Sequence, residues 1–126
     1  MPASGRVLIV DDEVNARAAL AELLRDEGYV VETVADGESA LAVLDSFRPQ
    51  VLLTDINMPH VDGLQLLRSV RERNTGITVV VMTAGDGVDT LRSASRQGAD
   101  YFLTKPIDLA ELGRIIGLVT ARATSS

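Results

Sequence analysis

Cysteine and tryptophan are absent from this sequence of 126 residues, and aromatic residues make up only 3% of it. Without cysteine, the chain cannot form disulfides, use a thiolate nucleophile or bind a metal through sulfur. The lack of cysteine fits a reducing compartment. Because aromatic residues are so few, the hydrophobic core must consist mainly of aliphatic side chains.

Long hydrophobic runs and an excess of basic charge are also missing. The apolar run that leads to Asp11 covers only residues 7–10. This run is too short for a signal peptide or a membrane span. The formal net charge of −6 argues against direct binding to nucleic acid, because phosphate contacts need a basic face. We therefore expect a soluble cytoplasmic protein that binds neither membranes nor nucleic acid.

The composition nevertheless supports a folded chain, since hydrophobic residues account for 46% of it. The length predicts one domain over residues 1–126. We expect a core of about 5–122 and a flexible tail at 123–126.

Short apolar runs rich in Val and Ile alternate with helical stretches along the chain. This alternation indicates an α/β fold with a parallel sheet that helices bury on both faces. Glu32 and Thr33 make the second run the most polar, which suits an edge strand. The predicted strands are 6–10, 30–34, 51–54, 77–82 and 101–104. The predicted helices are about 13–27, a second that follows Asp36 and ends before Pro49, 63–73, 88–97 and one that starts at Asp108.

The helix ends can also be read from the sequence. Gly28 and Gly98 are placed to end helices as left-handed caps, and Asp108 is placed as an N-cap. We expect the small, polar residues from Thr120 onward to fray. The predicted buried stripe of the last helix consists of Leu109, Leu112, Ile115, Ile116 and Val119.

Four of the five predicted strands end at residues that carry reactive polar groups. These residues are Asp11 with Asp12, Asp55, Thr83 and Lys105. In a parallel α/β sheet the ligand site lies outside the carboxyl ends of the strands, so these side chains should meet at one edge. Each alone is most simply a cap or turn residue, but their joint placement favours a site.

Carboxylates that converge without a partner repel one another and raise one another's pKa values. A hard divalent cation removes that penalty, and an all-oxygen ligand set favours Mg²⁺. A metal, an ammonium and a hydroxyl together supply the positioning and charge stabilisation that phosphoryl transfer needs. One of the aspartates could then act as the nucleophile, because Asp can form an acyl phosphate.

At these positions the sequence resembles the receiver domain of two-component response regulators, over nearly the whole chain. The resemblance implies a flavodoxin-like, doubly wound sheet of five strands in the order 2-1-3-4-5, with helices on both faces. It rests on four motifs in order along the chain: Asp11-Asp12-Glu13, Thr54-Asp55-Ile56-Asn57-Met58-Pro59 with Asp62-Gly63 after it, Met82-Thr83-Ala84, and Thr104-Lys105-Pro106.

The resemblance implies that Asp55 accepts the phosphoryl group. It also implies that Mg²⁺ is bound by Asp11, Asp12, Asp55 and the backbone carbonyl of Asn57. These assignments would make the acidic cluster a phosphorylation site that depends on a metal ion.

Further roles follow from the same resemblance. Lys105 would pair with the phosphoryl group and precede a cis bond to Pro106, and Thr83 would hydrogen-bond a phosphoryl oxygen. Phe102 occupies the place of the family's switch aromatic; it lacks the hydroxyl of a tyrosine, so it would act by packing alone. Its neighbour Tyr101 should face the other side of the sheet.

The implied partner is a histidine kinase or a phosphotransfer protein that donates a phosphoryl group to Asp55. The surface expected to change comprises the helix at 88–97, the strand at 101–104 and the helix from Asp108, and a homodimer through it is possible. The implied chemistry is limited to the domain's own phosphorylation and dephosphorylation, so it is not an enzyme acting on free substrates.

Three alternatives belong to other functional classes. A phosphatase of the haloacid dehalogenase type uses Asp-x-Asp, but the position two after Asp55 is Asn57, and an amide cannot serve as the general acid. A flavodoxin-like cofactor protein is disfavoured because Asp11 and Asp12 would repel a flavin phosphate. A constitutive interaction module with an inactive site is disfavoured by the complete acidic set.

Overall fold

The computed structural model describes residues 5–56, 63–73, 76–83 and 88–124. They form a sheet of five parallel strands in the order β2-β1-β3-β4-β5, which confirms the predicted fold and the edge position of the second strand. The strands are β1 (Arg6–Val10), β2 (Val30–Val34), β3 (Val51–Asp55), β4 (Thr78–Thr83) and β5 (Tyr101–Thr104). The helices are α1 (Val14–Asp26), α2 (Gly37–Phe47), α3 (Gly63–Arg73), α4 (Val88–Arg96) and α5 (Leu109–Thr124).

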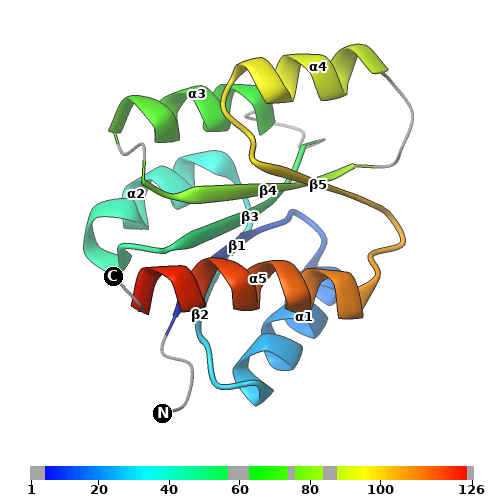
Figure 1. Cartoon of the computed structure of the whole chain (residues 1–126). Helices are drawn as coiled ribbons and strands as arrows, with labels where there is room; N and C mark the ends of the chain where they lie inside the picture. Colours follow the sequence, from blue (N-terminus) through cyan, green and yellow to red (C-terminus); the bar gives the residue numbers. More distant parts are fainter. Residues whose placement is uncertain (1–4, 57–62, 74–75, 84–87, 125–126) are drawn as a thin grey trace.

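Helices cover the sheet on both faces. Figure 1 shows α1 and α5 on one face and α2, α3 and α4 on the other. Along β1 the side chains alternate between two hydrophobic clusters: Val7 and Ile9 pack with α1 and α5, whereas Leu8 packs with α2, α3 and α4. The central strands are therefore apolar at successive positions because both of their faces are buried.

Local sequence signals set several helix ends as predicted. The helix predicted to follow Asp36 does so, and the structure adds that Asp36 caps it, since its carboxylate accepts a hydrogen bond from the N–H of Ser39 at 2.7 Å. Asp108 accepts from the N–H of Ala110 at 3.0 Å at the start of α5. Gly98 has a φ of +106°, a left-handed conformation that favours glycine after a helix.

The structure corrects the prediction in two places, both in α5. Leu109, predicted to be buried, is the first residue of the helix and is 49% exposed. The helix continues past Thr120 to Thr124, where fraying was predicted. Thr120 is only 5% exposed, and its hydroxyl donates to the carbonyl of Ile116 at 2.9 Å, so this turn is packed against the domain. The predicted strand bounds are otherwise within one residue, with Thr78–Thr83 observed for 77–82.

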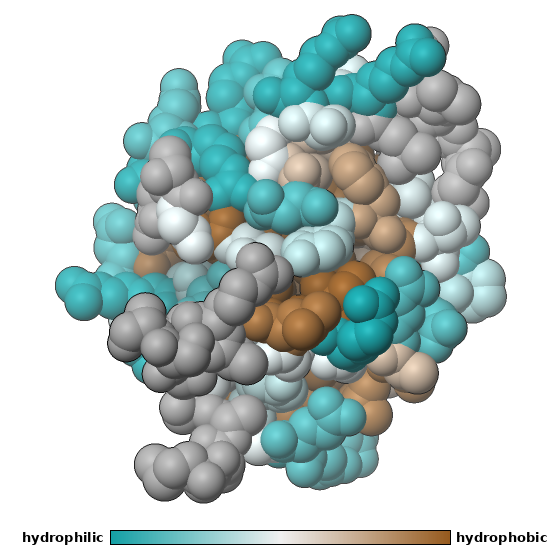
Figure 2. All heavy atoms as spheres, in the orientation of Figure 1, coloured by the Kyte–Doolittle hydropathy of each residue, from teal (hydrophilic) through white to brown (hydrophobic). Residues whose placement is uncertain are grey.

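Charged and apolar side chains are distributed unevenly over the surface. Figure 2 shows hydrophilic side chains along the top of the view, where α3 and α4 lie, and a hydrophobic area in the middle of the molecule. Within the described part of the chain, no helix is both long enough and apolar enough to cross a bilayer.

Candidate functional site

The carboxyl ends of β1, β3, β4 and β5 are adjacent in the sheet, so the residues that end these strands share one edge. In the β-sheet register, Asp55 stands beside Met82 and Thr83 stands beside Thr104. The N–H of Lys105 donates to the carbonyl of Thr83 at 2.7 Å. This bond holds Lys105 next to the end of β4.

Three carboxylates meet at this edge. Asp11, Asp12 and Asp55 each place a carboxylate oxygen within 4.8 Å of the others. Adjacent strand residues point to opposite faces, so Asp11 and Asp12 meet only because the chain bends after β1. The N–H of Glu13 donates to Asp11 Oδ1 at 2.9 Å within this bend. The predicted convergence of the three aspartates is thus confirmed.

The three carboxylates differ in their surroundings. Asp11 is 1% exposed and Asp55 is 6% exposed, whereas Asp12 is open to solvent. The Oδ2 atom of Asp11 is buried and has no hydrogen-bond partner among the residues that the structure describes. Burial raises the pKa of Asp11 above its usual value, although the N–H of Glu13 and the charge of Lys105 oppose this shift.

This arrangement has the chemistry of a divalent cation site. A buried carboxylate oxygen without a partner costs about 1–3 kcal/mol or more, and a cation between the three carboxylates would remove that cost. The donors are all oxygens, and the exposed side at Asp12 leaves access for water, as Mg²⁺ requires. Asp11, Asp12 and Asp55 therefore fit a bound Mg²⁺.

Lys105 supplies the positive charge at the site. Its Nζ lies 2.7 Å from Asp55 Oδ2, and the Lys105 and Asp55 side chains are 37% and 8% exposed. Burial of the ammonium disfavours its charge, but the hydrogen bond to Asp55 and the nearby carboxylates outweigh burial and raise the pKa of Lys105. The peptide bond from Lys105 to Pro106 is cis, as the resemblance implied.

Of the remaining predicted residues, Thr83 and Phe102 lie on the neighbouring strands β4 and β5. Thr83 ends β4 and is 3% exposed. Phe102 is 36% exposed, whereas Tyr101 packs partly against the cluster shared with α1 and α5, so the two aromatic rings lie on opposite sides of β5 as expected. Asn57, predicted to offer a backbone carbonyl, lies outside the described residues.

Sequence reasoning missed one residue beside the site. The guanidinium of Arg17 in α1 donates from Nη1 to the backbone carbonyl of Asp11 at 2.8 Å. A signal was present in the sequence, because cations are normally disfavoured near the N-terminus of a helix. Arg17 lies close to the start of α1, and the first turn of that helix contains no acidic residue.

The chain resembles known proteins in sequence and in structure. A family model described as the response regulator receiver domain matches residues 7–117. The chain is 42% identical over 115 residues to the transcriptional regulatory protein TrcR of Mycobacterium tuberculosis, a match that covers 90% of this chain and 45% of TrcR. It is 41% identical over 107 residues to the DNA-binding transcriptional regulator NtrC of Salmonella typhimurium, covering 85% of this chain and 23% of NtrC.

Among solved structures, the chemotaxis protein CheY4 of Vibrio cholerae superposes with a TM-score of 0.87 at 31% identity, covering 93% of this chain and 99% of that chain. The chain thus spans less than half the length of the two regulators named above, but nearly all of the CheY4 structure. The family match, the strand order and the acidic edge agree with the motifs from which the resemblance was drawn. The chain belongs to the response regulator receiver domain family of two-component systems.

Proposed function

We propose that Asp55 accepts a phosphoryl group from the phosphohistidine of a histidine kinase or phosphotransfer protein. A carboxylate oxygen of Asp55 attacks phosphorus, the phosphorus–nitrogen bond breaks, and the histidine leaves as a neutral imidazole after taking up a proton. The observation that carries this proposal is that Asp55 contacts the ammonium of Lys105 at 2.7 Å and lies within 4.8 Å of the acidic pair at the end of β1. Asp55 is thus the carboxylate that is paired with the ammonium and lies close to the oxygens that would bind the metal.

In this proposal Asp11, Asp12, Asp55 and the backbone carbonyl of Asn57 would hold Mg²⁺. When bound, the ion supplies charge neutralisation for the phosphoryl oxygens. Lys105 is held near the reacting group by its 2.7 Å contact with Asp55, and it would follow the negative charge onto the phosphoryl group. Thr83, at the end of the neighbouring strand, would donate its hydroxyl to a phosphoryl oxygen.

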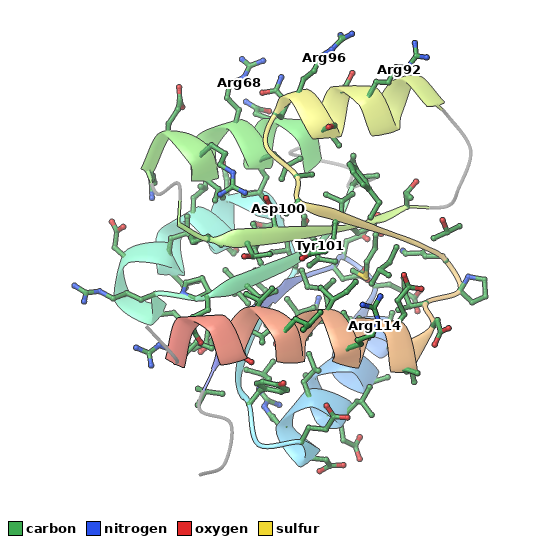
Figure 3. The ribbon with its side chains drawn as sticks, viewed as in Figure 1. Arg68, Arg92, Arg96, Asp100, Tyr101 and Arg114 are labelled. Atoms are coloured by element: carbon green, nitrogen blue, oxygen red, sulfur yellow. The ribbon has the colours of Figure 1, made fainter. Side chains whose placement is uncertain are left out.

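We further propose that phosphorylation changes the surface formed by α4, β5 and α5. Thr83 lies beside Thr104 in the register of β4 and β5, so a shift of Thr83 would act directly on β5. Phe102 on β5 would respond by repacking, since it has no hydroxyl. Figure 3 shows Arg92 and Arg96 on α4 and Arg114 on α5. The surface formed by these helices and β5 would bind a partner or a second copy of the chain.

The output of this switch would belong to another domain or protein. The sequence relatives named above are transcriptional regulators of which the chain spans 45% and 23%, and we propose a comparable regulatory role. The domain itself would act in the cytoplasm, would not bind nucleic acid directly, and would catalyse only its own phosphorylation and dephosphorylation. Its net charge of −6 supports the absence of direct nucleic-acid binding.

Intact-mass spectrometry after incubation with acetyl phosphate or phosphoramidate and Mg²⁺ tests the proposal. We expect a gain of one phosphoryl group that is absent without Mg²⁺ and absent in Asp55→Asn. The matched control is Asp45→Asn, which changes an exposed aspartate on α2 and should be phosphorylated like the wild type. A wild-type chain that gains no phosphoryl group, or Asp55→Asn that gains one, would contradict the assignment.

A further inference from the structure

Arg17 is the fourth residue of α1, directly after its first turn. The partial positive charge at a helix N-terminus favours acidic residues, yet the first turn of α1 contains none and Arg17 follows directly after it. The side-chain oxygen of Glu13, the N-cap residue, makes no capping hydrogen bond either. A departure from local rules at the edge of a functional site calls for a reason in that site.

The guanidinium of Arg17 makes a hydrogen bond to the bend that carries the acidic pair. Its Nη1 donates to the carbonyl of Asp11 at 2.8 Å, and its backbone N–H donates to the carbonyl of Glu13 at 3.0 Å. The same bend is tied on its other side by the N–H of Asp11, which donates to the carbonyl of Val34 at 3.2 Å. The backbone bond is the ordinary i→i−4 bond of the first helical turn, so it is the side chain of Arg17 that connects α1 to the end of β1.

The bend after β1 must orient two consecutive side chains in the same direction. It must bring the carboxylates of two consecutive residues, Asp11 and Asp12, to the same side as Asp55, which an extended strand cannot do. The carbonyl that Arg17 binds belongs to Asp11, the residue whose buried Oδ2 has no hydrogen-bond partner in the described part of the chain. Fixing the peptide at Asp11 limits how far that carboxylate can turn to find another partner.

We infer that Arg17 is a positioning residue of the metal site, which holds the bend at Asp11 so that its carboxylate and that of Asp12 stay aimed at the cation. The inference rests on the proposed function, in which these carboxylates bind Mg²⁺. Arg17 does not contact the cation in this role; it acts through the backbone of a ligand. Groups that orient metal ligands in this way typically change metal affinity by about 10- to 100-fold when removed.

Substitution of Arg17 separates two effects on Mg²⁺ affinity, because loss of its charge and loss of its positioning bond change that affinity in opposite directions. A guanidinium close to a cation site weakens cation binding by repulsion, so removing only its charge would tighten Mg²⁺ binding. Removing a bond that positions the ligands would weaken Mg²⁺ binding. A residue that only stabilises the fold would leave the affinity of the folded protein unchanged.

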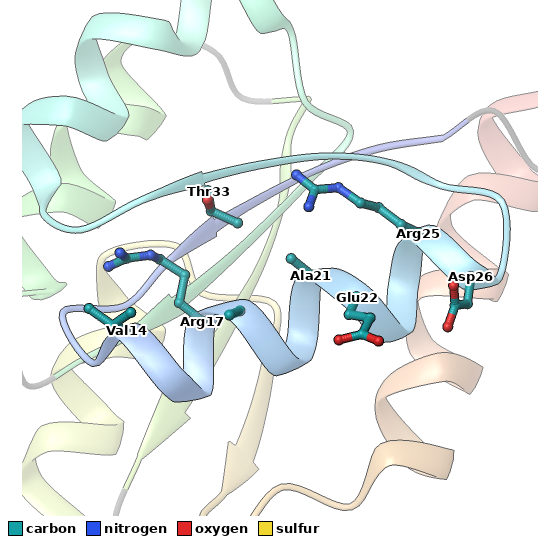
Figure 4. Close-up of a pocket in the computed structure, with 8 residues that line it drawn as sticks. Val14, Arg17, Ala21, Glu22, Arg25, Asp26 and Thr33 are labelled. Atoms are coloured by element: carbon teal, nitrogen blue, oxygen red, sulfur yellow. The ribbon is translucent and has the colours of Figure 1, made fainter.

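The same helix offers a matched control. Arg25 also donates from its guanidinium to a backbone carbonyl, that of Val31 in β2, at 2.9 Å. Figure 4 shows Arg17 and Arg25 on the same side of α1, where both line one groove with Thr33 of β2. Arg25 thus has the same residue type, helix, and kind of bond as Arg17, but lies toward the far end of α1 from the acidic pair.

The experiment measures Mg²⁺ affinity by calorimetric titration of the unphosphorylated chain with Arg17→Gln, Arg17→Lys and Arg25→Gln. We expect affinity about tenfold lower for Arg17→Gln, intermediate for Arg17→Lys, which keeps a charge and a donor, and unchanged for Arg25→Gln. In the metal-free protein, the amide chemical shifts of Asp12 and Glu13 should change in Arg17→Gln and not in Arg25→Gln.

Unchanged or tighter Mg²⁺ binding by a folded Arg17→Gln overturns the inference, and so does an equal loss in Arg25→Gln. Should thermal melting show Arg17→Gln to be unfolded, Arg17→Lys decides alone: affinity below the wild type supports the inference and wild-type affinity overturns it. A wild-type chain whose Mg²⁺ binding is absent or survives Asp12→Asn would instead contradict the proposed function. The two failures are therefore distinguishable.

Discussion

Replacing Asp11 by Asn tests whether the three converging carboxylates destabilise the folded protein when no cation is bound. Asp11 is 1% exposed, its Oδ2 has no hydrogen-bond partner within the described residues, and burial raises its pKa. Asn keeps an oxygen that can accept from the N–H of Glu13. Its amide group replaces the orphaned oxygen with a donor that can face the carboxylates of Asp12 and Asp55.

The structure sets the size of the expected effect. A buried polar atom without a partner costs about 1–3 kcal/mol, and the nearby ammonium of Lys105 already offsets part of the charge on Asp11. We therefore expect Asp11→Asn to raise the free energy of unfolding of the metal-free protein by about 1–2 kcal/mol at pH 7. Urea unfolding in the presence of a chelator measures this difference, and Asp45→Asn on the exposed side of α2 should change stability by less than about 0.5 kcal/mol.

The pH dependence has a defined sign. The pKa of Asp11 is raised in the folded state above the value of 3.8 that describes the unfolded chain, so its contribution to stability is greatest below pH 3.8 and declines as the pH rises through the folded pKa. Asp11→Asn lacks this titration. The stability advantage of the variant should therefore grow as the pH rises from below 3.8 and level off above the folded pKa.

Mg²⁺ should reverse the order of the two proteins. At a Mg²⁺ concentration of about 100 times its dissociation constant, the wild type should gain about 2.7 kcal/mol, whereas Asp11→Asn should gain much less because a ligand is lost. A metal-free Asp11→Asn that is less stable than the wild type would refute the reasoning. A stability difference that does not vary with pH would refute it equally.

Two further predictions concern Gly98, which follows α4, and Lys105 at the acidic site. Gly98→Ala should lower the free energy of unfolding by about 2–4 kcal/mol in urea titrations, because φ is +106° and a Cβ would lie 2.7 Å from Arg71 Cγ. Arg71 donates to the carbonyl of Gly98, so the substitution would also disturb that hydrogen bond. The control is Gly117→Ala, where the nearest atom to the added Cβ would be 3.8 Å away; it should be neutral or stabilise the protein by up to about 1 kcal/mol. Lys105→Met should destabilise the metal-free protein by only about 1 kcal/mol, since the side chain is 37% exposed, yet it should slow phosphorylation of Asp55 by acetyl phosphate at least about tenfold. Phosphorylation at the wild-type rate would show that the ammonium does not assist the transfer.

Much of the fold followed from periodicity in the sequence. Residues 6–10 and 30–34 were predicted as strands with the bounds that the structure has, because apolar runs of this length have few alternatives between helical stretches. The two errors lie in α5, where composition was misleading. Leu109 is apolar but exposed, and Thr120 is polar but buried with its hydroxyl bonded to its own helix. Burial at a helix end depends on which other segments pack against it, which periodicity does not encode.

The candidate site divides in the same way. The sequence by itself determined that Asp11, Asp12, Asp55, Thr83 and Lys105 come together, since parallel strands bring their carboxyl ends to one edge whatever the details of packing. Only the tertiary structure decided that Asp11 rather than Asp12 is the buried carboxylate, and that Lys105 pairs with Asp55 across 50 positions of sequence. It alone placed the guanidinium of Arg17 on the carbonyl of Asp11. Burial and hydrogen bonding depend on distances between segments that the chain brings together only on folding, so no local pattern specifies them.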